Sequence, residues 1–333
     1  MTTAADVLNG SARWSCETAD VLAWLDQLPD DSVDLLVTSP PYELARTYGI
    51  GEKMVGGQAW VDWMVGVVRA ASPKVKGLIA INCEGQTRNY RYSCVPFLLV
   101  ADLHRAGFNL RKPPAFHRVG IPGSGGPDWL RNDYEPIICV TRPGRLPWSD
   151  NTACGHPPKW APGGEMSHRL TDGTKRNQFG MNGTQNRRNE KGVRETMNAR
   201  FRHAKDGTVK GEHARDINQA DEAHGFLGYD APALANPGNV IKCNVGGGVM
   251  GHELAHQNEA PFPLDLPAFF VKSFCPPDGI VCDPFTGSGT TAHAAIENGR
   301  RFIGCDVRES QADLTARRLA TITPDLFSAG PTR

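Results

Sequence analysis

The spacing of hydrophobic residues predicts alternating strands and helices in the first part of the chain. Residues 34–38 (DLLVT) form a short, continuous apolar run, which is typical of a strand buried in a parallel sheet. In residues 19–28 the apolar positions recur at helical spacing, at Val21, Leu22 and Leu25. The same patterns predict helices over 58–71 and 94–106, and strands over 76–83, near 108–118 and over 135–141.

The C-terminal part of the chain returns to this alternation. It predicts strands over 279–283 and 301–306, and helices over 266–275, 288–298 and 310–321. Helices that connect parallel strands cover both faces of the resulting sheet. We therefore expect an α/β fold with a doubly wound, mostly parallel sheet.

The middle of the chain has a different composition. Residues 142–250 are rich in Gly, Asn, Arg, Lys and His and poor in aliphatic residues. The 333-residue chain is neutral, with 36 Lys and Arg against 36 Asp and Glu, but residues 159–215 hold 13 Lys and Arg against 6 Asp and Glu. This basic segment has a net charge of +7, and the rest of the chain has a net charge of −7. We expect three parts, 1–144, an insert over 145–250, and 251–333.

Composition also limits the class of protein. No run reaches the roughly 18 apolar residues that a membrane span needs, and the start MTTAADVLNG lacks the basic and apolar regions of a secretory signal. Nine dispersed cysteines without a C-x-x-C pair are typical of reduced thiols. We expect a cytoplasmic protein that does not associate with a membrane.

A glycine-rich segment, DPFTGSGTT at 283–291, follows a predicted strand and precedes a predicted helix. This is the context of a nucleotide-binding loop, in which Gly287 and Gly289 would let the backbone approach a ligand closely. Asp306 ends the next predicted strand. An acid at that place can accept hydrogen bonds from the hydroxyl groups of an adenosine ribose.

Several interpretations of this loop, each with a different class of ligand, are open. A P-loop requires a Lys after its last glycine, whereas Thr290 follows Gly289. The dinucleotide pattern G-x-G-x-x-G/A matches over 287–292, but only 27 residues follow Asp306, too few for the rest of a dinucleotide-binding domain. S-adenosylmethionine, which has a ribose and no pyrophosphate, is the third class. A tight turn without a ligand is the remaining interpretation.

The segment TSPPY at 38–42 ends another predicted strand. In an open α/β sheet, ligands bind beyond the carboxyl ends of the strands. Pro40 and Pro41 fix φ and lack N–H donors, while their carbonyl groups remain able to accept hydrogen bonds. A rigid loop with Ser39, the Pro40 carbonyl and Tyr42 is suited to hold an exocyclic amino group and a planar ring. A Pro-Pro turn that only ends the strand is the alternative.

Together, TSPPY and DPFTGSGTT resemble the motifs of the amino-group DNA methyltransferases, which transfer a methyl group from S-adenosylmethionine to cytosine N4 or adenine N6. The catalytic motif comes first, a variable region follows and the cofactor motif comes last, which is the order of the permuted β group of this family. The resemblance lies at the two ends of the chain. It implies a Rossmann-like methyltransferase fold with circularly permuted motifs.

The resemblance also assigns roles to residues. It implies that S-adenosyl-L-methionine is bound by Asp283, Phe285, Gly287, Gly289, Asp306, Phe262 and Pro263. It implies that the catalytic tetrapeptide is Ser39, Pro40, Pro41 and Tyr42. A further acid that the family carries near the N-terminus here matches either Glu17 or Asp20.

Ser39 favours cytosine N4 as the target, because family members that modify adenine usually carry Asp at this position. N6-adenine methylation is the alternative. The Ser39 hydroxyl and the Pro40 carbonyl would accept hydrogen bonds from the amino group and leave its lone pair available for direct attack on the sulfonium methyl, with proximity as the main catalytic effect. A base cannot be reached inside a duplex, so we expect it to be flipped into the pocket and stacked on Tyr42.

The basic insert lies where the family has its target-recognition region. Arg, Lys, Asn and Gln contact phosphates and base edges, and the predicted DNA contacts are Lys175, Arg176, Arg187, Arg188, Arg200 and Arg202. The expected partner is double-stranded DNA, with a cognate restriction endonuclease as a second candidate and the chain acting as a monomer or homodimer. A solvated insertion, an NAD-dependent dehydrogenase and a non-catalytic DNA-binding protein are the alternatives.

One further motif points to different chemistry. Residues 252–256 (HELAH) match H-E-x-x-H, in which two histidines on one helical face bind zinc. The glycine-rich stretch before the motif and Pro261 and Pro263 after it disfavour a long helix. His256 also falls where the methyltransferase family often has a His. We expect no metal site.

Overall fold

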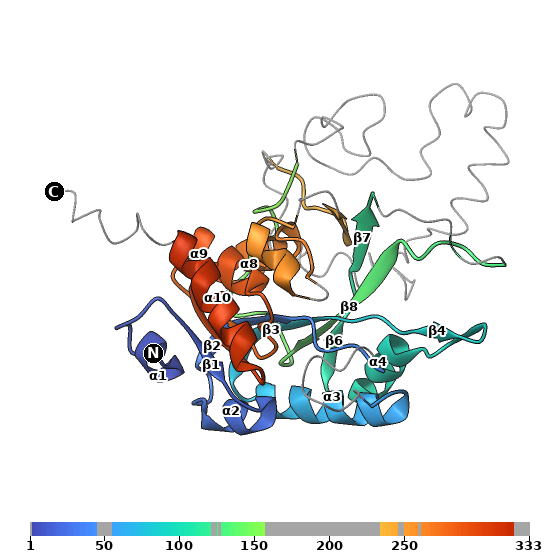
Figure 1. Cartoon of the computed structure of the whole chain (residues 1–333), viewed down its shortest axis with the longest axis horizontal. Coiled ribbons are helices and arrows are strands. Elements are labelled where there is room, and N and C mark those ends of the chain that lie inside the picture. The colour runs from blue at the N-terminus through green and yellow to red at the C-terminus, as the bar shows by residue number, and fades with distance from the viewer. Residues whose placement is uncertain are drawn as a thin grey trace, which may run out of the picture. The chain divides into compact units, whose positions relative to one another are not determined.

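A nine-stranded sheet with helices on both faces forms the core of the protein (Figure 1). The computed structural model describes residues 2–44, 55–120, 125, 128–156, 234–245, 250–258 and 261–322. The strand order is β1-β11-β10-β2-β3-β8-β7-β9, and β6 pairs with β8 beside this path. The strands are β1 (Trp14–Thr18), β2 (Val33–Thr38), β3 (Val75–Asn82), β6 (Asn109–Arg111), β7 (Ala115–Val119), β8 (Tyr134–Thr141), β9 (Val240–Asn244), β10 (Ile280–Asp283) and β11 (Arg301–Asp306).

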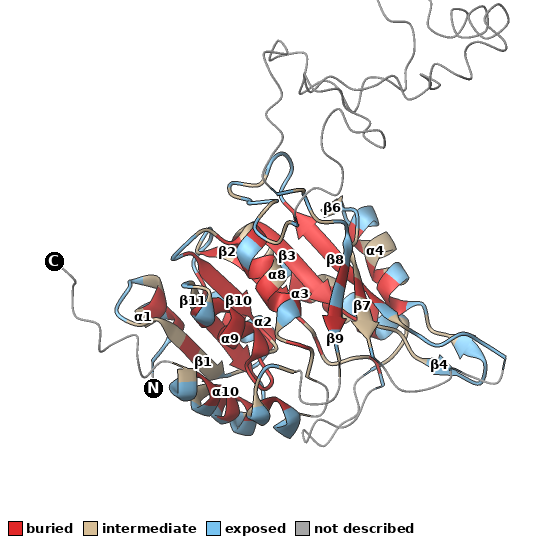
Figure 2. Ribbon diagram, turned by 90° about the horizontal axis from the view of Figure 1, so that it is seen from above, coloured by how far each residue is buried: buried red, intermediate tan, exposed pale blue. Residues whose placement is uncertain are grey.

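Two groups of helices sandwich this sheet. One face packs against α1 (Ala4–Leu8), α2 (Val21–Gln27), α3 (Gln58–Ala71) and α4 (Val95–Arg105). The other face packs against α8 (Asp265–Phe274), α9 (Thr290–Glu297) and α10 (Glu309–Ile322). The central strands are buried from both sides, as Figure 2 shows, which is why they read as continuous apolar runs. The expected doubly wound, mostly parallel α/β fold is confirmed.

The direction of chain progression reverses between β10 and β2. From β10 the chain proceeds to β11 on one side, whereas from β2 it proceeds to β3 on the other. All these strands are parallel, so their carboxyl ends meet at one edge. Such a reversal leaves a crevice beyond the strand ends where ligands bind. The two sequence motifs follow β2 and β10 and therefore lie beside this crevice.

The helices and strands expected from the hydrophobic pattern are present, and the pattern missed a few short elements. The hairpin of β4 (Thr87–Arg88) and β5 (Arg91–Tyr92), together with α1, β1 and β9, had no clear periodic signal. Strand β9 pairs parallel with β7 although it comes from the predicted insert. The chain divides into two compact units, residues 1–154 with 236–333, and residues 155–235, so both ends of the predicted insert lie in the first unit.

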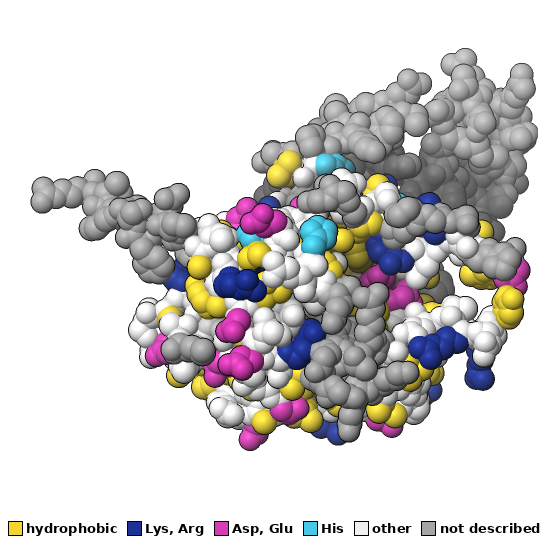
Figure 3. All heavy atoms as spheres, in the orientation of Figure 1, with side chains coloured by type: hydrophobic (Ala, Val, Ile, Leu, Met, Phe, Trp, Pro, Cys, Tyr) yellow, Lys and Arg dark blue, Asp and Glu magenta, His cyan; other side chains and the backbone are white. Residues whose placement is uncertain are grey.

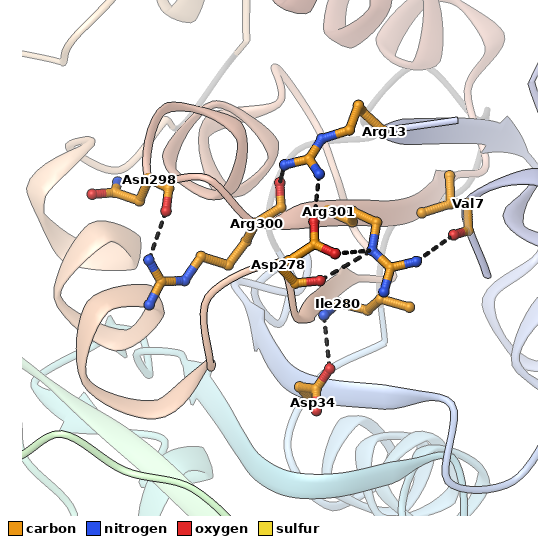
Figure 4. A network of polar contacts seen from close by, with 8 residues as sticks. All are labelled: Val7, Arg13, Asp34, Asp278, Ile280, Asn298, Arg300 and Arg301. Atoms are coloured by element: carbon orange, nitrogen blue, oxygen red, sulfur yellow. Dashed lines mark hydrogen bonds and ion pairs between the residues drawn. The ribbon is translucent and has the colours of Figure 1, made fainter. Parts of the chain in front are cut away.

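The two ends of the chain are tied together around Asp278 (Figure 4). Arg13 and Arg301 both form ion pairs with the Asp278 carboxylate. The Arg301 guanidinium also donates to the Val7 carbonyl at 2.9 Å and to the Asp278 carbonyl at 3.0 Å. The Ile280 N–H donates to the Asp34 carboxylate at 2.8 Å. These contacts hold β10 and β11 against the N-terminal elements.

A buried hydrogen bond joins the ends of β2 and β10. The Thr38 hydroxyl donates to Asp283 Oδ1 at 2.6 Å, across 245 residues of sequence, and the Phe285 N–H donates to the same oxygen at 3.0 Å. Asp283 is 1 % exposed. Burial raises the pKa of this carboxyl to about 6, although the hydrogen bonds from Thr38, Thr291 and Phe285 act in the opposite direction.

The structure also bears on two expectations about the whole chain. None of the described helices is both long enough and apolar enough to cross a membrane. All nine cysteines are free thiols.

Replacing Arg301 should destabilise the fold more than neutralising its partner. Arg301→Ala removes charge-assisted hydrogen bonds to two backbone carbonyls, so we expect a loss of about 1–3 kcal/mol in the free energy of unfolding. Asp278 is 66 % exposed, so Asp278→Asn should cost at most about 1 kcal/mol. Asn also tolerates the left-handed backbone at this position, where φ is 58°. Urea unfolding measures both, and equal losses would contradict this assignment.

The buried Asp283 should make stability depend on pH. Because its pKa is raised in the folded state, ionising it opposes folding, and this penalty is absent below about pH 4 and complete above about pH 6. The unfolding free energy of the parent should therefore fall relative to Asp283→Asn as pH rises through this range. Thr38→Val removes a hydrogen bond that lowers the pKa, so it should shift the transition to higher pH. A pH-independent difference between parent and Asp283→Asn would disprove the expectation.

Candidate functional site

A cavity of about 620 Å³ lies beyond the carboxyl ends of the parallel strands. Its size falls in the range of sites for small-molecule ligands. The loops that follow β2, β10 and β11 line it, together with side chains of β3, β7, β8 and α3. The two sequence motifs therefore face one shared space.

The glycine loop between β10 and α9 requires its glycines for two different contacts. Gly287 has φ 53°, and a Cβ there would lie 2.8 Å from the Asn258 side chain at the cavity. Gly289 has φ 76°, and a Cβ there would lie 2.8 Å from the Thr315 hydroxyl of α10. The first glycine keeps the cavity open, and the second lets α10 pack against the loop.

Helix α10 holds this loop from behind. The Thr315 hydroxyl donates to the Gly287 carbonyl at 3.0 Å. The fully buried Arg318 donates to the Ser288 carbonyl at 3.1 Å and to the Thr290 hydroxyl at 3.0 Å, and burial lowers the pKa of its guanidinium to about 10. The loop is therefore fixed on the side away from the cavity.

Asp306 ends β11 and lines the cavity. Its carboxylate accepts hydrogen bonds from the Gly287 N–H at 3.0 Å and from the Arg308 N–H at 2.9 Å, and burial raises its pKa. A carboxylate has about four acceptor positions, so it can accept further hydrogen bonds from hydroxyl groups of a ligand. Asp283 differs in position, because it lies beneath the loop and does not line the cavity.

The SPPY loop, residues 39–42, is anchored by α3 and the residue that precedes it. The Trp60 indole N–H donates to the Pro41 carbonyl at 2.9 Å, and the buried Glu43 carboxylate accepts from the Gly57 N–H at 2.7 Å. No described residue donates a hydrogen bond to the Pro40 carbonyl. All four motif residues, Ser39, Pro40, Pro41 and Tyr42, line the cavity.

A polar cluster at the cavity wall was not found from the sequence. The Tyr42 hydroxyl donates to Glu135 Oε2 at 2.7 Å, and the Asn82 amide donates to the same oxygen at 2.7 Å and to the Tyr42 hydroxyl at 3.1 Å. Arg118 forms an ion pair with Glu135 Oε1 at 3.1 Å. Burial and the Glu135 charge raise the pKa of Tyr42. Asn82, Arg118 and Glu135 come from β3, β7 and β8, respectively. Only the antiparallel pairing of β8 with β3 and β7 brings them together.

Apolar side chains form another part of the wall. Phe285 of the glycine loop packs against Trp63 of α3 with ring centroids 5.5 Å apart. Phe262 and Pro263 also line the cavity. A planar, partly apolar ligand would pack well against these side chains.

The structure distinguishes the two acids near the N-terminus. Asp20 lines the cavity and caps α2 by accepting from the Leu22 and Ala23 N–H groups. Glu17 accepts from the Ala4 N–H at 2.8 Å and from the Trp24 indole at 3.3 Å, and it does not line the cavity. Asp20 is therefore the acid placed to meet a ligand.

The predicted site residues thus divide into three groups. The structure brings to one cavity Ser39, Pro40, Pro41, Tyr42, Phe262, Pro263, Phe285, Gly287 and Asp306. Asp283 and Gly289 support the loop from outside the cavity. The predicted DNA contacts Lys175, Arg176, Arg187, Arg188, Arg200 and Arg202 lie outside the described residues. On the face shown in Figure 3, the described Lys and Arg side chains are scattered among acidic and apolar ones.

The HELAH segment forms a five-residue 3₁₀ helix, η2 (Glu253–Gln257), with His252 as its cap. His252 accepts from the Leu254 N–H at 3.1 Å, and its other ring nitrogen lies 3.0 Å from the Thr321 hydroxyl. Both ring nitrogens are therefore engaged within the fold. The described part of the chain contains no group of three or more His, Cys, Asp or Glu side chains that could hold a metal ion.

Known proteins with similar sequences are methyltransferases. The type II methyltransferase M.ScaI of Streptomyces caespitosus is 38 % identical over 68 residues, which cover 20 % of this chain and only 22 % of that protein. The type II methyltransferase M.SfiI of Streptomyces fimbriatus is 23 % identical over 87 % of both chains. The first match lies in a limited segment, whereas the second extends over most of the chain.

Solved structures show the same fold. The PvuII DNA methyltransferase, named as cytosine-N4-specific, matches with a TM-score of 0.57 and 17 % identity over 92 % of this chain and 88 % of that one. The putative DNA modification methylase TTHA0409 of Thermus thermophilus, solved in complex with S-adenosyl-L-methionine, matches with a TM-score of 0.52 and 20 % identity over 94 % and 95 %. These likenesses support the methyltransferase fold.

A family model described as DNA methylase matches residues 33–317, which include both motifs, the segment between them and most of the residues that line the cavity. This match extends over most of the chain, so the protein belongs to the N6/N4 family of DNA methylases.

Proposed function

We propose that this protein transfers a methyl group from S-adenosyl-L-methionine to the exocyclic amino group of a DNA base, with cytosine N4 as the target. The observation that carries the proposal is that the SPPY loop and the glycine loop open into one cavity, joined through Thr38 and Asp283. Membership of the DNA methylase family supports the reaction class.

The cavity fits the proposed cofactor. Asp306 has acceptor positions for the ribose hydroxyls, Gly287 leaves room beside them, and Phe285 offers a ring face to the adenine. Phe262, Pro263 and Asp20 line the remaining wall for the methionine part. S-adenosyl-L-methionine supplies an electrophilic methyl group when it is bound. Asp283 and Gly289 hold the loop in shape and need not touch the cofactor.

The SPPY loop is suited to hold the target base. Ser39 Oγ and the Pro40 carbonyl would accept hydrogen bonds from the two N–H groups of the amine, which leaves the nitrogen lone pair free to attack. The rigid prolines and the hydrogen bond from Trp60 to the Pro41 carbonyl hold the backbone that carries both acceptors. Tyr42 would stack on the base after it is flipped from the duplex.

The target base is proposed from Ser39. Adenine-modifying members usually carry Asp at this place, and the fold resembles an enzyme named as cytosine-N4-specific. N6-adenine methylation by the same geometry is the second candidate. We also propose that the basic insert, with Lys175, Arg176, Arg187, Arg188, Arg200 and Arg202, contacts the DNA backbone.

Nucleoside mass spectrometry of host DNA tests the function directly. Expression of the parent chain should introduce N4-methylcytosine, and Ser39→Ala should reduce it at least about tenfold, because one acceptor of the amine is lost. The affinity for S-adenosyl-L-methionine, measured by calorimetry, should change less than about twofold. N6-methyladenine would select the second candidate, and unmodified DNA from a folded, cofactor-binding protein would refute DNA methylation in that host.

A second prediction concerns the cofactor loop. Gly287→Ala places a Cβ 2.8 Å from Asn258 at a backbone φ of 53°, so the loop must shift and S-adenosyl-L-methionine affinity should fall at least about tenfold. Gly10→Ala is the matched control, because it has φ 86° and nothing within 4 Å of the added Cβ. Calorimetry should show unchanged affinity for the control. Equal affinities of all three proteins would contradict the assigned cofactor site.

A further inference from the structure

A short hairpin projects from the protein directly after a strand that contributes to the cavity. It consists of β4 and β5, and Figures 1 and 2 both show it on an arm that extends beyond the sheet. The arm begins at the end of β3, where Asn82 lines the cavity. Arg88 follows six residues later, so its Cα lies at most about 22 Å from that of Asn82. Duplex DNA covers this distance in roughly six base pairs.

The base of the hairpin is hydrogen-bonded to the residues that directly follow the SPPY loop. The buried Glu43 carboxylate accepts from the Gln86 N–H at 3.2 Å, and the Gln86 amide donates to the Glu43 carbonyl at 2.5 Å. The Arg88 guanidinium donates to the Leu44 carbonyl at 3.4 Å. A ligand bound by the hairpin would therefore be held next to the chain segment that carries the SPPY loop.

The hairpin concentrates positive charge. Residues 86–93 (QTRNYRYS) contain two arginines and no Asp or Glu. These arginines, Arg88 and Arg91, are exposed and lie directly opposite each other in the β4–β5 pair. Like charges in opposite positions destabilise a strand pair. Phosphate groups bound between them would offset this repulsion, because a guanidinium offers several N–H donors to phosphate oxygens.

The tip of the hairpin carries an aromatic ring on an unfavourable backbone. Asn89 and Tyr90 form the two-residue turn, with φ of 48° and 62°. Positive φ at both positions is typical of a type I′ turn, in which glycine is preferred at the second position. Tyr90 occupies this position instead and is 82 % exposed. Neither burial nor turn geometry accounts for a tyrosine there, which indicates contact with a ligand.

We propose that this hairpin binds the duplex that carries the target base, with Arg88 and Arg91 on phosphates and Tyr90 packed against the sugars between them. The inference rests on the proposed function and adds a DNA-contacting element that is separate from the basic insert. Two opposed arginines match the regular negative charge of a DNA backbone, and a flipped base enters the cavity from a duplex beside it. The hydrogen bonds to Glu43 and Leu44 would then link the position of the duplex to that of the SPPY loop.

The salt dependence of DNA binding tests the two arginines. Fluorescence anisotropy with a labelled non-specific duplex gives the affinity at several salt concentrations. Each lost phosphate contact lowers the slope of log affinity against log salt by about 0.9, so Arg88→Gln combined with Arg91→Gln should lower it by about 1.8. The affinity at low salt should fall at least about tenfold.

The matched control is Arg69→Gln combined with Arg105→Gln. It removes the same charge from two exposed residues in the last turns of α3 and α4. Helix α3 contacts the SPPY loop near its start, and α4 begins directly after the hairpin, so both arginines lie at the far ends of these helices. The control should keep the salt slope and the affinity of the parent.

Tyr90→Gly separates DNA binding from stability. Glycine suits the second position of the turn, so the Tm should equal or exceed that of the parent. The affinity for the duplex should nevertheless fall at least about threefold, because the ring no longer packs against the DNA. A tyrosine with a merely structural role would give the opposite result, a lower Tm with the affinity of the parent.

Several outcomes would overturn the inference. A double hairpin variant with the salt slope and affinity of the parent would do so, as would a Tyr90→Gly protein with the affinity of the parent, or a parent that does not bind the duplex. Failure of the proposed function is distinguishable, because the parent would then introduce no methylated base into host DNA, whatever the hairpin variants bind.

Discussion

The site depends on one buried contact between distant parts of the chain, the hydrogen bond from Thr38 to Asp283. It lies where β2 and β10 run side by side in parallel, with Leu35 opposite Val281 and Leu36 opposite Cys282. A buried carboxylate is costly unless it is hydrogen-bonded. Asp283 receives hydrogen bonds from Thr38 and from the Phe285 N–H, one from each motif-bearing strand end. The two loops are therefore held beside each other at the same edge of the sheet.

Around this contact, helices outside the cavity hold both of the loops that line it. Helix α10 holds the glycine loop through Thr315 and Arg318, and α3 holds the SPPY loop through Trp60. The groups that face the cavity are thus fixed by residues that do not face it. This arrangement is what a reaction that relies on proximity requires, because the acceptors are oriented before a ligand arrives.

The cavity combines two kinds of wall. Trp63, Phe285 and Phe262 provide apolar surface, whereas Asn82, Arg118 and Glu135 form a polar cluster around Tyr42. Tyr42 belongs to both, because its ring lies at the cavity and its hydroxyl reaches the polar cluster. One residue of the SPPY motif therefore connects base stacking, as proposed, with the charge on Glu135.

The sequence alone determined the elements and the local motifs. Continuous apolar stretches within residues 34–38 and 301–306 revealed the buried strands, because strands buried on both faces have no polar alternation. Strands β1 and β9 escaped detection, since five residues with mixed burial carry little periodic signal. The glycine and proline motifs were recognisable because each depends on residues only a few positions apart.

What only the tertiary structure decided is which distant residues meet at the cavity. Asn82, Arg118 and Glu135 lie on three strands with no local motif, and they converge because β8 runs antiparallel between β3 and β7. The structure also distinguishes Asp20 from Glu17. Asp20 caps α2 and lines the cavity, whereas Glu17 accepts a hydrogen bond from Trp24 away from it. Asp283, chosen from the sequence as a cofactor residue, lies beneath the loop because β10 pairs with β2 there. Strand order and register determine such contacts, and short-range sequence patterns predict neither of them.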